Sequence, residues 1–198
     1  MATKEIHRSF QITQDGTGLR IGIVSTRSHA EIVGPLVTGT KNALLERGVS
    51  RKDLCYLTVT RPFDLPFAAK AMLRSAKPPL DGVICLGCMI QDELKGRFEF
   101  ESEAVALAIM KLNLKGSIPV VYGVLTCVNK QQALGFLGQS SSGDQVSDDH
   151  GFEWAKTAIS LAKLSKAIQD EAETRAEAEQ AHRKKLEKAR AQPVHVVE

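Results

Sequence analysis

The sequence predicts an α/β fold in which a four-stranded parallel sheet carries helices on both faces. Short apolar runs alternate along the chain with segments of helical spacing, which is typical of α/β layer folds. The runs are apolar throughout rather than alternating with polar residues, as expected of parallel strands covered on both faces. With 198 residues, the chain has room for one domain and a tail.

Four runs are expected to be strands. The first is Arg20-Ile-Gly-Ile-Val24, and the others span residues 54–59, 82–86 and 118–125. In a doubly wound sheet, ligands bind beyond the carboxyl ends of the strands. The loops that follow these four runs are therefore the first places to search for a site.

Helical spacing is clearest over residues 32–47, where the pattern stops at Gly48, a typical residue just past a helix end. The other expected helices span residues 63–76, 102–114, 129–137 and 153–167.

The composition changes after about residue 168. Residues 169–190 are rich in Ala, Glu, Lys and Arg, which favours a helix. Almost all of its apolar residues are alanines, so it has no convincing heptad seam. We expect a solvated extension of the last helix, with a partner-binding helix as the alternative and a frayed end over residues 192–198. The expected organisation is an arm (1–14), a domain (15–167) and a charged helical tail (168–198).

The composition is that of a globular protein, with 43% hydrophobic and 25% charged residues. The net charge of +3 is too small to indicate a nucleic-acid partner. No apolar stretch approaches the roughly 20 residues of a membrane span, and the N-terminus lacks the apolar core of a secretory signal. We therefore expect a cytoplasmic protein without a nucleic-acid or membrane partner.

Cys85 and Cys88 form a C-x-x-C pair, a spacing found in redox dithiols and in half of a zinc site. No second C-x-x-C or H-x-x-x-H accompanies it. We favour Cys85 as a buried strand residue with Cys88 just past the strand, and we expect no metal site.

Six segments in unbroken order carry a resemblance to one family. They are residues 20–27, 63–69, 81–90, 98–105, 119–134 and the His150-Gly151, Glu153-Trp154 pairs. Over residues 15–165 the chain resembles the 6,7-dimethyl-8-ribityllumazine synthases, and the last segment is similar to the H-N-H-G-x-D-W signature of their fungal branch.

The resemblance implies a flavodoxin-like doubly wound fold and a transferase of riboflavin biosynthesis. The family condenses 5-amino-6-ribitylamino-uracil with 3,4-dihydroxy-2-butanone 4-phosphate to 6,7-dimethyl-8-ribityllumazine, releasing water and phosphate. It needs no metal or organic cofactor. Its sites lie between the subunits of a homopentamer, and some members stack pentamers into larger shells.

The resemblance also assigns substrate-binding positions. Ser28 and His29 stand where the family has an aromatic residue, which stacks on the pyrimidine, followed by Asn, so the flat face is lost unless His29 replaces it. An exposed loop histidine is the alternative. Pro62, Phe63 and Asp64 occupy the ribityl-binding positions, although Asp64 is one methylene shorter than the family's Glu.

Four further positions are expected to contact substrate. Cys88, Met89 and Ile90 follow the third strand, and Tyr122 matches an aromatic residue that the family contributes from a neighbouring subunit.

The expected phosphate site departs most from the family's Gly-x-Thr cradle. Asp92 and Glu93 would repel a phosphate, and Phe136 replaces an arginine. Lys95 and Arg97 are the phosphate-binding candidates by their charge, with a solvated charged loop as the alternative.

Arg97 also stands at the family's catalytic histidine. Arginine keeps its proton under ordinary conditions, so it can stabilise an anion but cannot shuttle a proton near pH 7. We therefore expect lumazine synthase activity to be reduced or lost. The alternative is a catalytically inactive relative that serves as an oligomeric assembly subunit or binds a flavin-like ligand.

Overall fold

The computed structural model describes residues 14–137 and 150–190 of the chain. The expected arm, up to residue 13, and the expected frayed end lie outside the described residues. The described elements are β1 (Ile21–Thr26), α1 (Ala30–Glu46), a 3₁₀ turn (Arg51–Asp53), β2 (Leu54–Val59), a 3₁₀ turn (Pro62–Asp64), α2 (Leu65–Ser75), β3 (Gly82–Ile90), α3 (Gln91–Leu94), α4 (Phe98–Lys115), β4 (Val120–Cys127), α5 (Lys130–Gly135) and α6 (His150–Arg190).

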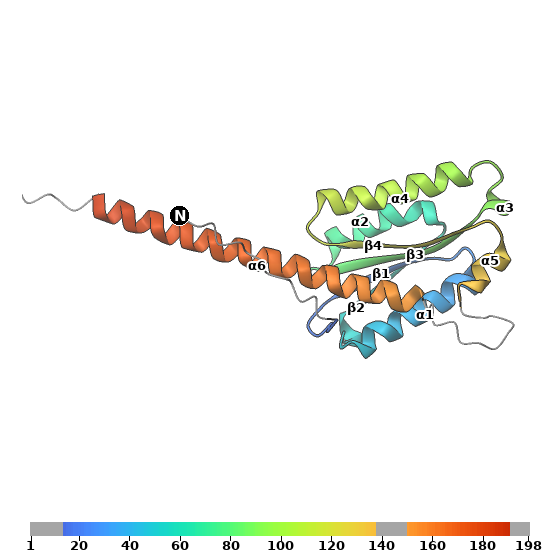
Figure 1. Cartoon of the computed structure of the whole chain (residues 1–198), viewed down its shortest axis with the longest axis horizontal. Helices are drawn as coiled ribbons and strands as arrows, with labels where there is room; N and C mark the ends of the chain where they lie inside the picture. The colour runs from blue at the N-terminus through green and yellow to red at the C-terminus, as the bar shows by residue number, and fades with distance from the viewer. Residues whose placement is uncertain (1–13, 138–149, 191–198) are drawn as a thin grey trace, which may run out of the picture.

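The four strands form one parallel sheet in the order β2-β1-β3-β4. Helices α2 and α4 cover one face, and α1 and the first part of α6 cover the other (Figure 1). The predicted four-stranded α/β layer fold with a long C-terminal helix is thus confirmed.

The core is divided by the sheet into two layers. Ile21 and Ile23 pack toward α1 and α6, whereas Val24 and Cys85 pack toward α2 and α4. All nine residues of β3 are buried, as the apolar pattern predicts for a central parallel strand. The two layers fix the central strands, whose carboxyl ends frame the candidate site.

Helix α1 ends at the predicted glycine. Gly48 adopts a left-handed φ of 88°, a conformation open to glycine at little cost. The N–H groups of Gly48 and Val49 then donate to the carbonyls of Leu45 and Leu44, which closes the helix end.

The third strand is longer than expected. It continues past Gly87 to Ile90, so the expectation that Cys88 lies just past the strand was wrong. Pairing of Ile90 with Cys127 supplies this end of β3 with a partner on β4, which the sequence of β3 alone does not reveal. A Cβ on Gly87 would also meet Leu65 at 3.2 Å, so here the glycine reflects close packing rather than a chain break.

Other boundaries differ by smaller amounts. Helix α4 begins at Phe98, four residues before the expected start, and β4 is displaced two residues along the chain from the expected run. The segment Gln91–Leu94 forms the single turn α3 where a loop was expected.

Strand β2 is not covered on both faces. It lies at one edge of the sheet, with Tyr56 51% and Leu57 38% exposed. The apolar sequence of β2 predicted that both of its faces would be buried. In the sheet, however, β2 pairs with β1 alone and has no strand on its other side.

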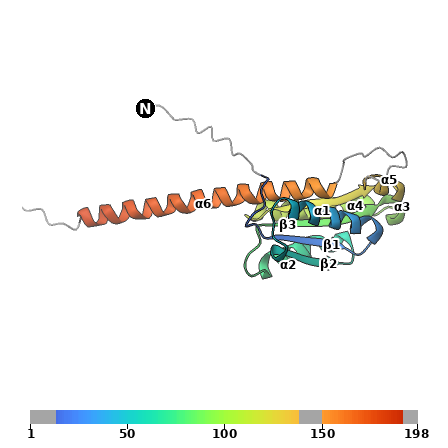
Figure 2. The same cartoon turned by 90° about the horizontal axis from the view of Figure 1, so that it is seen from below.

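Helix α6 continues to Arg190 and leaves the body as a projecting rod (Figure 2). The side chains of residues 168–184 are exposed, and ion pairs join Arg175 to Glu179 and Arg183 to Glu187 at 3.0 and 3.3 Å. The predicted helical extension is therefore present, and its solvation rather than partner binding stays a prediction. No helix in the described residues is long and apolar enough to cross a membrane.

Candidate active site

A pocket of about 380 Å³ opens at the carboxyl ends of the strands. The pocket lies between the ends of β1 and β3. From β1 the chain runs to β2 on one side of the sheet, and from β3 it runs to β4 on the other side. Parallel α/β sheets bind ligands at a switch point of this kind. The pocket is lined by Ser28, His29, Arg61, Pro62, Cys88, Met89, Ile90, Glu93, Leu94, Arg97 and Glu101.

The wall after β1 is fixed by backbone hydrogen bonds to the loop after β2. The N–H of Arg27 donates to the carbonyl of Val59 at 2.9 Å, and that of Ser28 donates to Thr60 at 3.1 Å. The Ser28 hydroxyl oxygen is buried and has no hydrogen-bond partner in the described part of the chain. Because a buried hydroxyl is costly to leave unsatisfied, it is suited to contact a ligand in the pocket.

His29 begins helix α1 in a left-handed conformation, with φ 54° and ψ 48°. Histidine, like asparagine, tolerates this region better than most residues. Its carbonyl accepts hydrogen bonds from Ile32 and Val33 at 2.8 Å. The side chain is 17% exposed, and its Nε2 lies 3.5 Å from Oε2 of Glu93 on α3. The ring is thus mostly buried at the pocket wall rather than solvated in a loop.

Charged side chains of both signs meet around the pocket. Arg97 Nη1 lies 3.4 Å from Oε1 of Glu101, one helical turn later. Beside the pocket, Lys130 lies 2.6 Å from Glu31, and this contact lowers the pKa of Glu31 below its usual value. Together with Arg61, which also lines the pocket, these residues give the lining cations for an anionic ligand beside the carboxylates of Glu93 and Glu101.

Cys88, which lines the pocket, and the core residue Cys85 are poor nucleophiles. Burial raises the pKa of the Cys88 thiol to about 12, and burial does the same for Cys85. A thiol with such a pKa stays neutral near pH 7, so Cys88 lines the pocket without acting as a nucleophile. The described residues contain no cluster of three or more His, Cys, Asp or Glu that could hold a metal ion.

The segment expected to cradle phosphate uses several of its N–H groups within the protein. The N–H of Asp92 donates to the Val128 carbonyl at 3.2 Å, and the N–H of Arg97 donates to Leu94 at 3.1 Å. Lys95 is exposed, with a φ of 31°, and is not among the pocket residues. Of the two phosphate candidates, the structure thus brings only Arg97 to the pocket.

Phe63 and Asp64 lie beside an adjacent hollow of about 520 Å³, together with Arg27 and Phe67. Asp64 Oδ2 accepts a hydrogen bond from the Arg61 N–H at 3.0 Å. The shorter carboxylate therefore closes the turn that carries Arg61, and Pro62 separates the two hollows.

Tyr122 and Phe136 do not reach the main pocket. Tyr122 lines a hollow of about 410 Å³ at the β4 edge, between α4 and α6, beside Trp154. Phe136 ends α5 and meets the ring of His150 edge-on, with 5.1 Å between centroids. Within one chain, these two positions lie apart from the other candidate residues.

Two charged wall residues were not assigned to the site from the sequence. Arg61 directly precedes the expected Pro62, and Glu101 follows Arg97 by four residues on one helix. The i,i+4 spacing was a usable signal for Glu101, because such residues share a helix face. Glu93 was expected only to repel phosphate, and its contact with His29 had no sequence signal.

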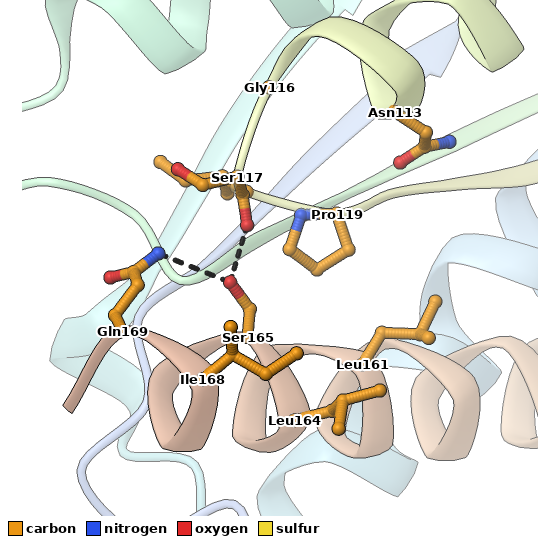
Figure 3. Close-up of a pocket in the computed structure, with 10 residues that line it drawn as sticks. Asn113, Gly116, Ser117, Pro119, Leu161, Leu164, Ser165, Ile168 and Gln169 are labelled. Carbon is orange, nitrogen blue, oxygen red and sulfur yellow. Dashed lines mark hydrogen bonds between the residues drawn. The ribbon is translucent and has the colours of Figure 1, made fainter. Parts of the chain in front are cut away.

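Another apolar pocket, of about 410 Å³, lies at the opposite end of the sheet (Figure 3). It sits between the loop before β4 and helix α6, where Ser165 donates a hydrogen bond to the Ser117 carbonyl and accepts one from Gln169 at 3.2 Å. None of its lining residues is ionisable. It offers no group for proton transfer, so the chemistry belongs at the carboxyl ends.

Comparison with known proteins identifies similar sequences. A family model described as 6,7-dimethyl-8-ribityllumazine synthase matches residues 18–166. The chain is 35% identical over 143 residues to the 6,7-dimethyl-8-ribityllumazine synthase of Cytophaga hutchinsonii, covering 72% of this chain and 82% of that protein. It is 30% identical over 160 residues to the enzyme of the same name from Phocaeicola vulgatus, covering 81% of this chain and 90% of that protein.

Proposed function

The chain belongs to the 6,7-dimethyl-8-ribityllumazine synthase family of riboflavin biosynthesis, and from this membership we propose that it forms 6,7-dimethyl-8-ribityllumazine slowly. The substrates are 5-amino-6-ribitylamino-uracil and 3,4-dihydroxy-2-butanone 4-phosphate. The observation that carries the proposal is the pocket at the β1/β3 switch point, which contains Ser28, His29, Pro62, Cys88 and Arg97 on its walls.

The reduced rate follows from three replaced groups. Arg97 stands at the family's histidine and cannot exchange a proton near pH 7, so the acid–base group that the family keeps at this position, typically worth about 10²–10⁴ in rate, is absent from it. Ser28 offers no flat face for the pyrimidine. Phe136 provides no cation for the departing phosphate, where charge develops. Holding the two substrates together still supplies rate by proximity, so slow turnover remains.

A turnover assay tests this function directly. The purified protein is incubated with both substrates, and lumazine formation is compared with the uncatalysed background. We expect a rate above background but well below that of the Cytophaga hutchinsonii enzyme. Ordinary family turnover would refute the idea of a degraded site, and background turnover would refute catalysis.

A restored site tests the cause. Ser28→Trp, His29→Asn, Arg97→His and Phe136→Arg are combined, with the loop after Ile90 rebuilt toward Gly-x-Thr. We expect this protein to be faster than the unmodified chain, because the stacking face, proton carrier and phosphate cation return together. A matched control carries the same number of changes on the exposed tail.

A second candidate function is an assembly subunit, or a binder of flavin-like ligands, without turnover. The exposed apolar hollow beside β4 supports it, since this surface is independent of the altered pocket. Background turnover together with oligomer formation, or with saturable riboflavin binding in a fluorescence titration, would favour this candidate.

We further propose a homo-oligomer, most simply a pentamer, in the cytoplasm, with a small pyrimidine as ligand. The uncovered sheet edges support association, as do Met110 and Leu114 on α4, which are 56% and 78% exposed. Residues 15–167 would form the working domain, and residues 168–198 the tail. The His150-Gly151 and Glu153-Trp154 pairs support a fungal-like branch.

A further inference from the structure

Arg97 cannot take the proton-exchanging role of the family's histidine, but a different histidine, His29, lines the same pocket. We propose that His29, oriented by Glu93, is the acid–base group of this enzyme, so that proton transfer has moved from the start of α4 to the start of α1. This inference rests on the proposed lumazine synthase function. It goes beyond it by assigning a catalytic role to a histidine–carboxylate pair.

The geometry of His29 carries the inference. Its ring lines the pocket and is largely shielded from water. The Nε2 atom of the ring lies 3.5 Å from Oε2 of Glu93. A carboxylate on one ring nitrogen fixes the orientation of an imidazole and stabilises its protonated form, which leaves the other nitrogen for the substrate. In this proposal the reacting nitrogen is Nδ1, the ring nitrogen that does not face Glu93.

The backbone holds the ring at this wall. The left-handed conformation of His29 is anchored on both sides, by the Ser28 N–H bond to Thr60 and by the bonds from Ile32 and Val33 to the His29 carbonyl. These bonds fix the backbone that carries the ring, and Glu93 is the contact of the ring itself. Histidine is also the side chain that ordinarily exchanges a proton between about pH 5 and 8.

Charged groups from each neighbouring element face His29. They are Glu31 of α1 with its partner Lys130 of α5, Arg61 after β2, Glu93 of α3, and Arg97 and Glu101 of α4. Glu31 and Glu101 are already engaged by cations, whereas Glu93 pairs with His29. The pair thus lies within a nearly balanced set of charges, and Glu93 is the carboxylate that acts on the ring.

The step is dehydration of the adduct between the two substrates. The pyrimidine amine adds to the ketone carbon to give a carbinolamine. Protonated His29 then gives its Nδ1 proton to the carbinolamine hydroxyl, the C–O bond breaks, and water leaves with the bonding pair. The nitrogen lone pair forms the C=N bond, and the proton left on that nitrogen returns to Nδ1. The imidazole is unchanged overall, and one water is released.

His29→Asn is the direct test, because asparagine accepts the same left-handed backbone. We expect kcat/KM to fall at least about 100-fold, as for loss of a general acid–base. The limb of the pH profile between about pH 5 and 8 should disappear. Glu93→Gln should lower the rate less, because the imidazole remains and only the carboxylate that orients it is lost. Thermal unfolding checks that both variants fold.

Matched controls separate a catalytic role from a general effect. His182→Asn on the tail and Glu103→Gln on α4 are exposed and outside the pocket, so both should keep the rate and the pH profile. In the His29→Asn/Arg97→His double variant, which returns the histidine to the family position, activity should recover together with the pH limb.

The outcomes distinguish the two proposals. An active wild-type protein whose rate and pH profile survive His29→Asn overturns the role of His29 and leaves the function standing. A wild-type protein at background turnover overturns the function and the role of His29 with it. An active folded wild type with an inactive, folded His29→Asn variant supports both.

Discussion

At the scale of single residues, the segment after Ile90, which begins with the single turn α3, determines how the pocket meets an anion. Several N–H groups of this segment bond to carbonyls of the protein itself, and Glu93 brings negative charge to the wall. The available cations, Arg61 and Arg97, belong to other segments. An anion is therefore met by side-chain charge rather than by a backbone cradle.

We accordingly expect weak phosphate binding at neutral pH. Isothermal titration calorimetry with inorganic phosphate should give no micromolar affinity, because Asp92 and Glu93 repel it and Phe136 gives no donor. Any residual binding should be lost in Arg97→Ala and kept in Lys95→Ala, since only Arg97 lines the pocket. Micromolar affinity in the wild type would contradict this expectation.

The cysteines give a second expectation at this scale. Burial raises the pKa of Cys85 and of Cys88 to about 12, from an ordinary value of 9.0. At pH 8 their thiolates are about a thousandfold rarer than in the unfolded chain. Iodoacetamide should therefore label the half-buried Cys55 first, and Cys85 and Cys88 only after unfolding, as measured by mass spectrometry.

The same shifts set a pH window for stability. A raised thiol pKa favours folding below about pH 9, and this contribution is lost as the pH rises from 9 toward 12.

Alkylation of Cys85 as fast as Cys55 in the folded protein would show that the core opens.

Individual site residues were only partly predictable. Ser28, His29 and Arg97 could be placed near the carboxyl ends because parallel strands end at one edge. The contact of His29 with Glu93 could not be predicted, because it depends on the left-handed backbone of His29 and on the one-turn helix α3 that carries Glu93. Tyr122, expected to act from a neighbouring subunit, and Phe136 both lie outside this pocket in the single chain, so their expected roles stay predictions.

At the scale of elements, the junction between α4 and β4 depends on one amide side chain. Asn113 Oδ1 accepts a hydrogen bond from the Val120 N–H at 2.7 Å, and Nδ2 donates to the Val120 carbonyl at 2.9 Å. The pair joins the end of the helix to the first residue of the edge strand.

Asn113→Ala should therefore destabilise the fold by about 1–3 kcal/mol, because both backbone groups of Val120 lose a partner. Urea unfolding followed by circular dichroism measures the change. Asn42→Ala, at an exposed position of α1, is the matched control and should leave stability nearly unchanged. Equal effects of the two substitutions would show that the junction adds nothing.

The elements themselves were more predictable than their ends. Helical spacing and continuous apolar runs marked α1 and β2 closely, since both patterns are local. The end of β3 was placed too early, at residue 86, because pairing with β4, which extends the strand to Ile90, is not visible in the local sequence. Strand order, which leaves β2 at the edge, is a property of the whole sheet and not of any one run.

At the scale of the whole molecule, apolar surface beside β4 remains uncovered in the single chain. Met110 and Leu161 line the hollow between α4 and α6, and Tyr122 and Trp154 lie in the same surface. Exposed contiguous apolar surface of this kind is typical of an interaction site.

Light scattering should therefore give a mass that is a multiple of the 21.6 kDa chain, five chains being the expected number. Met110→Glu with Leu161→Glu should shift the mass toward a single chain, because burying two carboxylates at an interface is costly. Thr174→Glu, on the exposed tail, is the control and should not. A wild-type mass of one chain at micromolar concentration would contradict association.

Helix α6 passes the amino end of β4 and continues away from the body, opposite the end that opens the pocket. At 1.5 Å per residue, residues 169–190 extend roughly 33 Å beyond the domain. A reporter or a second enzyme fused after Arg190 would therefore be carried on a built-in spacer. Such a fusion leaves the mouth of the pocket open to diffusing substrates, and in an assembly it would display one cargo per subunit.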